Sequence, residues 1–155
     1  MTVRTSIVSN LPGSLHALIG DGAIFGVIAN NIYFDDRTRY KREQVEVILT
    51  WMGRQTAALI PGRLITSTVD IELFVATPDL VVDKSRRIED KIERTARTIV
   101  ENYDNNEGVA AGLCGSTVDY VRCVETSPID ILGPDDDPRY KYTQHLTLEI
   151  CAWES

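Results

Sequence analysis

The chain has 155 residues, of which 43% are hydrophobic and 25% charged, an ordinary composition for a single globular domain that buries its own core. Its net charge of −7 argues against broad capture of nucleic-acid phosphate or anionic lipid, because either requires a basic face. No stretch approaches the roughly 18 uninterrupted apolar residues of a membrane span. The three cysteines lack C-x-x-C spacing and are expected to be reduced thiols. We expect one domain, residues 1–155, without a membrane partner.

The N-terminal part of the chain predicts a helix followed by a strand. Apolar residues in 3–19 recur at nearly helical spacing, and Pro12 either opens a helical turn there or divides the helix into two. Residues 25–34 are apolar and rich in β-branched side chains, which favours a strand.

The segment Val45–Thr77 predicts a long antiparallel hairpin. Its two apolar sets recur at every second residue, which places each set on one face of a strand. The middle, residues 55–63, is predicted to be a loop longer than a two-residue turn. We expect the arms or the tip to reach beyond the domain and to need a partner. The alternating sets are Val45, Val47, Leu49 and Trp51, then Val69, Ile71, Leu73 and Val75.

Apolar side chains are also predicted on the second face of this hairpin. Trp51 falls on the core face, whereas Ile48, Met52 and Phe74 fall on the opposite one. Since an antiparallel sheet can leave that face in water, large apolar groups there indicate a cover, either a helix or another subunit.

The second half of the chain predicts one amphipathic helix and two strands. Residues 83–103 have apolar positions at spacings of three and four, and the helix is expected to end in residues 104–108. Strands are predicted at 117–126 and 142–153. The connection 127–141 is long and contains three prolines, so it is expected to be functional or mobile. The fold class is α+β, a mostly antiparallel sheet packed by this helix and the N-terminal one.

No residue set has the spacing of a catalytic or metal site. His16 and His145 are expected to be exposed or hydrogen-bonded, and the Asp135, Asp136 and Asp137 run lacks the glycine and alternation of a calcium loop. Residues 37–42 hold four cations (Arg37, Arg39, Lys41 and Arg42), which suit either a solvated loop or a contact with an acidic partner or with phosphates. We expect no enzyme activity, no cofactor and no metal.

The order of elements from about residue 25 onward resembles the tail terminator proteins of long-tailed bacteriophages. The resemblance lies in the hairpin Val45–Thr77, the helix Asp83–Tyr103, the strand Val118–Glu125 and the closing strand Tyr142–Trp153 with its Tyr-x-x-x-Leu-x-Leu-x-Ile pattern. The acidic loop before this last strand is longer than the short connection of that family.

The resemblance implies a structural virion protein of the tail and neck, assembled in the host cytoplasm. Members of that family form a hexameric ring that caps the tail tube, ends its polymerisation and joins the tail to the head connector. The implied partners are other copies of the chain, the tail tube protein and the connector, with genomic DNA passing through an acidic lumen without specific binding. The expected contact residues are Ile48, Met52, Arg54, Gln55, Leu59, Arg63, Phe74, Asp135, Asp136, Asp137 and Arg139.

Three alternative functions remain at the level of the sequence. The chain could be another tail or neck component, such as a tail completion, head-closure or tube subunit. It could also be a small α+β enzyme with a site in residues 127–141. The third alternative is a monomeric binding module that uses the hairpin as its recognition arm.

Overall fold

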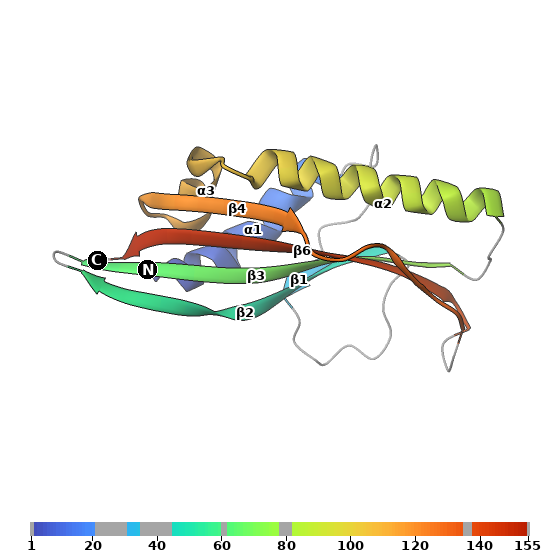
Figure 1. Ribbon diagram of the computed structural model, residues 1–155, viewed down its shortest axis with the longest axis horizontal. Coiled ribbons are helices and arrows are strands. Elements are labelled where there is room, and N and C mark those ends of the chain that lie inside the picture. Colours follow the sequence, from blue (N-terminus) through green and yellow to red (C-terminus); the bar gives the residue numbers. More distant parts are fainter. Residues whose placement is uncertain are drawn as a thin grey trace.

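The computed structural model describes residues 2–20, 31–34, 45–59, 62–77, 82–134 and 138–154, with backbone alone at 54, 58, 59 and 82–85. In these residues a six-stranded sheet carries three helices on one face (Figure 1). The α+β prediction is confirmed. The elements are α1 (Val3–Ile19), β1 (Ile32–Phe34), β2 (Val45–Leu59), β3 (Gly62–Thr77), α2 (Val82–Tyr103), α3 (Glu107–Cys114), β4 (Val118–Glu125), β5 (Asp130–Leu132) and β6 (Tyr140–Glu154).

The sheet follows the order β1-β2-β3-β6-β4, and β5 pairs with the beginning of β6. Every pair is antiparallel except β1 with β2, which is parallel. The central pair, β3 and β6, stays in register from Arg63 opposite Glu154 to Thr77 opposite Tyr140. The alternation predicted for the last strand is confirmed, because Leu146, Leu148 and Ile150 are buried in the main core.

Helix α1 is continuous, so Pro12 does not divide it. Thr2 caps its start by accepting a hydrogen bond from the Thr5 amide. The carbonyl that a helical proline leaves unpaired belongs to the residue four positions earlier, here Val8, whose side chain is 39% exposed, so water can reach this face. The opposite face packs into the core through Val3, Ile7, Leu11, Leu15 and Ile19.

Helix α2 confirms the amphipathic pattern. Ile92, Ala96, Ile99 and Tyr103 are fully buried on one side. The Tyr103 hydroxyl lies 2.6 Å from Ser14 Oγ, which joins α2 to α1. Burial raises the Tyr103 pKa, so this hydroxyl keeps its proton well into the alkaline range.

A short third helix, α3, follows α2 in a region where the sequence predicted no helix. After Tyr103, Asn105 adopts φ 53°, and α3 begins after Asn106, whose side chain accepts from the Val109 amide. Gly115 ends it with φ 64°, a left-handed conformation that suits glycine. The prediction that the long helix ends at residues 104–108 is confirmed, because α2 ends at Tyr103, but the helix that follows this turn was not predicted.

Two other boundaries differ from the predictions. Of the strand predicted at 25–34, the described part is β1, Ile32–Phe34, while residues 25–30 lie outside the described residues. The connection 127–141 holds a short strand, β5, on the same side of β6 as β4. No helix among the described residues is long and apolar enough to cross a membrane.

Candidate functional site

The β2–β3 hairpin is confirmed, but its predicted loop is wrong. The strands pair from Val45 opposite Val75 to Leu59 opposite Gly62, so residues 55–59 continue β2 and two residues separate the strands. The segment has no unbroken apolar alternation, because neither of its faces is packed against a helix. Sequence periodicity reports burial and not strand formation itself.

The end of the hairpin is open on both faces. Gln55, Thr56, Ala57 and Arg63 are all exposed, although they alternate between the two sides of the sheet. In Figure 1 the paired ends of β2 and β3 reach beyond the helices, close to both chain termini. The predicted contact residues Gln55 and Arg63 therefore lie in an accessible arm, while the side chains of Arg54 and Leu59 lie outside the described residues.

A β-bulge at Met52 changes the direction of this arm. Trp51 pairs with Val69 and Gly53 with Thr68, which leaves Met52 as the extra residue. Gly53 has φ 133°, a region that L side chains rarely adopt. Met52 is 63% exposed, so nothing in its own chain covers it as a side chain of the second face was expected to be covered, and its contact with a partner stays a prediction.

Among the described residues, a strand lies beside the outer edge of β2 over only a short part of its length. The short strand β1 pairs only with Val47–Leu49, and no other described strand neighbours β2 from Thr50 to Leu59. A free edge of this kind offers backbone N–H and C=O groups to a strand of another chain. The arm can thus bind a partner through its backbone as well as its side chains.

The predicted second apolar face is present, but the subunit itself covers it. Ile48, Phe74 and Ala76 form a cluster separate from the main core, with Tyr33 packed against it. Ile48 is 4% exposed and Phe74 is 1% exposed within the single chain. The expectation that these two side chains offer surface to a neighbouring subunit is therefore corrected: they stabilise the subunit.

Beyond this cluster, the face of the sheet opposite the helices is polar. Asp70 and Glu72 of β3 lie beside Thr147 and His145 of β6, and Glu149 lies opposite Thr68. The Tyr120 hydroxyl donates a hydrogen bond to Glu149, which raises the Tyr120 pKa. The Arg122 guanidinium lies over the Tyr120 ring, 5.2 Å from its centroid. The described part of this face carries more carboxylates than cations.

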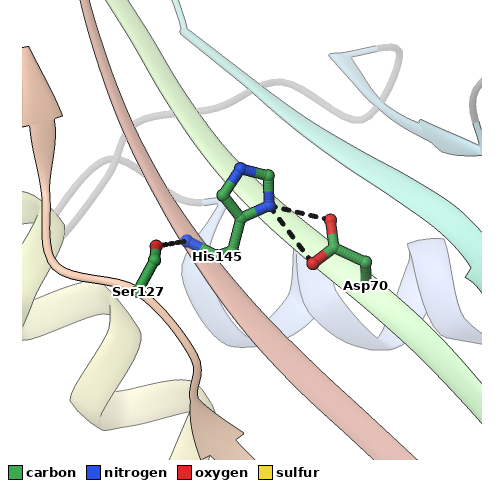
Figure 2. A network of polar contacts seen from close by, with 3 residues as sticks. All are labelled: Asp70, Ser127 and His145. Carbon is green, nitrogen blue, oxygen red and sulfur yellow. Dashed lines mark hydrogen bonds and ion pairs between the residues drawn. The ribbon is translucent and has the colours of Figure 1, made fainter.

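Ser127, His145 and Asp70 resemble a catalytic triad in composition but not in geometry (Figure 2). His145 Nδ1 lies 2.9 Å from Asp70, as in a triad. Ser127 Oγ, however, accepts a hydrogen bond from the backbone amide of His145 at 3.0 Å, and the second ring nitrogen points away from it. His145 is therefore not positioned to activate the Ser127 hydroxyl as a base. The two contacts instead hold β6 at His145 against β3 and against the turn at Ser127.

A groove that the sequence did not predict lies between α2 and residues 125–129. It has a volume of about 680 Å³ and is lined by Glu89, Glu93 and Arg97 of α2, with Glu125 from the end of β4. Gln144 of β6 also lines it. The carboxylates come from two elements about 30 residues apart in the chain, so no local pattern in the sequence brings them together.

The structure describes the connection 127–141 except for residues 135–137. Asp135, Asp136 and Asp137 lie outside the described residues, so their predicted contacts stay predictions. Arg139 is half-buried and engaged with another residue. Within the described ranges, no group of three His, Cys, Asp or Glu side chains has the arrangement of a metal site.

The three cysteines are free and buried. Burial, with the nearby Asp104 carboxylate, raises the pKa of Cys123 to about 12 from an ordinary 9.0. Since the thiolate is the reactive form, Cys123 is expected to be inert in the folded chain.

This shift predicts a loss of stability at alkaline pH. Between pH 9 and 12 the unfolded chain releases the Cys123 proton while the folded chain retains it, so stability falls as pH rises, by up to about 1.4 kcal/mol per pH unit. Urea unfolding from pH 7.5 to 10.5 measures this slope. The Cys123→Ala variant, which cannot titrate there, should have a shallower slope, and equal slopes would contradict the assignment.

Comparisons with known proteins give a likeness in fold without one in sequence. No protein family and no curated protein matches the sequence. Among solved structures 28 chains match. One of them, from the virion of a native gene transfer agent particle, aligns with 94% of this chain and 98% of its own, at a TM-score of 0.48 and 6% identity.

Proposed function

We propose that the protein is a structural, non-enzymatic component of a phage-type virion. In this proposal six copies form a ring that caps the tail tube. The ring would end tube polymerisation and join the tail to the head connector. One observation carries the proposal: the β2–β3 arm extends beyond the helices with two open faces and with an edge that no other described strand pairs with beyond Leu49. The resemblance in the order of elements supplies the identity of the assembly.

A ring requires contacts that differ on the two sides of each subunit. In cyclic assemblies one surface of a subunit meets a different surface of the next, and the set closes after a fixed rotation. The arm with Met52, Gln55 and Arg63 supplies one such surface. The Ile48 and Phe74 cluster is not part of it, because those side chains already lie inside the subunit.

The polar face of the sheet supports the second part of the proposal, a channel for DNA. Asp70, Glu72 and Glu149 lie on the face opposite the helices. If this face lines the lumen, the carboxylates repel DNA phosphate, because binding would require neutralising cations. DNA could then pass without adhering to the wall. Imaging of the ring at a resolution that places β3 and β6 tests this, and finding their polar face on the outer wall would refute the channel.

A tube-growth assay tests the function itself. Tail tube subunits assembled alone are expected to give tubes of uncontrolled length, whereas addition of this protein should stop growth and leave a ring at one end. Negative-stain images and the mass in solution provide the readouts. A stable monomer that neither binds tube ends nor changes tube length would contradict the proposal, and would favour a monomeric binding module.

A further inference from the structure

The groove between α2 and residues 125–129 contains three carboxylates without partners. Glu89 is half-buried, and Glu93 and Glu125 are exposed. Within the part of the chain that the structure describes, no ion pair or hydrogen bond joins any of the three to another residue. Arg97 is the one cation among the groove residues. The groove therefore has an excess of negative charge that is suited to a cationic ligand.

A second, independent feature of the groove points to a ligand with N–H donors. Gln144 is 3% exposed, and its Nε2 donates to the Ser127 carbonyl at 3.3 Å. Its other amide atom, Oε1, is buried and has no hydrogen-bond partner. A buried acceptor without a hydrogen-bond partner is destabilising, because it has lost its hydrogen bonds to water. An N–H donor of a ligand that reaches the base of the groove would form a hydrogen bond with this oxygen and remove the destabilisation.

The polar and apolar side chains that line the groove together suit one kind of ligand, the side chain of arginine or lysine. Such side chains have an aliphatic stem and a charged head with several donors. Pro128 and Ile129 offer apolar surface for the stem, and the carboxylates offer acceptors for the head. Because the described residues hold no cluster that could bind a metal, a metal ion is a poorer fit than an organic cation.

The chain itself contains a matching segment. Residues 37–42 hold four cations in six positions, and this stretch connects β1 to β2. The groove lies beside β4 and β5, whereas β1 is at the opposite edge of the sheet. A closed ring of identical subunits requires two different surfaces of one chain that complement each other, and the acidic groove and the basic segment are complementary in charge.

We propose that the groove binds the basic segment 37–42 of a second copy of this chain, an inference that rests on the proposed ring and names one of its contacts. The carboxylates of Glu89, Glu93 and Glu125 would pair with cations of the segment of the next subunit. Because both partners are charged, its strength should decrease as salt rises.

A charge-swap experiment tests this contact. The groove variant carries Glu93→Lys and Glu125→Lys, and the segment variant carries Arg37→Glu and Arg39→Glu. Each alone places like charges together and is expected to weaken self-association at least about 100-fold. Mixed in equal amounts, the two should assemble again, because every contact then joins opposite charges. The restored rings must alternate the two variants, so their copy number must be even.

Matched controls separate the contact from a change in net charge. Asp90→Lys with Glu101→Lys, and Lys91→Glu with Arg94→Glu, make equal charge changes at exposed positions of α2 outside the groove. Both controls should assemble like the wild type. Sedimentation velocity at low and high salt, with negative-stain images, measures assembly, and circular dichroism verifies folding of every variant.

The other outcomes are distinct. Normal assembly of both reversed variants would overturn the groove contact and leave the ring intact. Rescue only when all four substitutions are in one chain, and not on mixing, would place the contact within a subunit and overturn the proposal. Wild-type chains that pair through this contact into open oligomers would support it while refuting the ring. Chains that never associate, even with tube ends present, would refute both.

Discussion

Replacing Phe74 with aspartate is expected to unfold the subunit and not merely to prevent assembly. Phe74 is 1% exposed and packs with Ile48 and Ala76 in the smaller apolar cluster. Removing a buried phenylalanine typically destabilises a protein by about 3–5 kcal/mol, and burying an unpaired carboxylate adds to this. The total approaches the roughly 5–15 kcal/mol by which most domains are stable. Urea unfolding and near-ultraviolet circular dichroism provide the measurements.

Met52→Asp is the matched control, because Met52 lies on the same hairpin but is 63% exposed. This variant should keep its stability within about 0.5 kcal/mol of the wild type. Ile48→Asp should behave like Phe74→Asp, since Ile48 is 4% exposed. A folded, monomeric Phe74→Asp variant would show instead that the cluster belongs to an interface between subunits.

Substitution of Gln55 and Arg63 together by glutamate is expected to have the opposite effect, a loss of assembly with the fold retained. Both side chains are exposed near the end of the hairpin, where no helix covers them. The free energy of unfolding should change by less than about 0.5 kcal/mol. If the arm contacts the next subunit, the ring should dissociate at concentrations more than tenfold higher than for the wild type.

The comparison requires a variant with the same number of changes elsewhere. Thr98→Glu with Arg94→Glu alters α2 outside the hairpin and should leave assembly unchanged. Sedimentation velocity over a concentration series gives the dissociation constants. Equal constants for the hairpin variant and the wild type would exclude these two side chains from the interface, and would leave the outer edge of β2 as the contact to test.

The sequence predicted the elements whose residues are periodic. Val69, Ile71 and Leu73 face the core from β3 as their alternation indicated, and Ile92, Ala96 and Ile99 do so from α2. Such periods arise because burial on one side of a strand or helix selects apolar residues at its own repeat. The open part of the hairpin has no such selection, which is why residues 55–59 were predicted to form a loop and are paired strand instead.

Other features depend on which segments meet in space. Phe74 is buried or exposed according to which residues pack over β3. Helix α3 follows a turn at Asn105, and a turn leaves no periodic pattern in the sequence. The groove combines Glu93 of α2, Glu125 of β4 and Gln144 of β6, which become neighbours only when the helix lies across the sheet. Local sequence thus determined the periodic strands, helices α1 and α2 and the pairing of β2 with β3 in a hairpin, but not α3 or β5. The tertiary structure alone decided which apolar side chains are already covered and which charges remain for a partner, because both depend on contacts between distant segments.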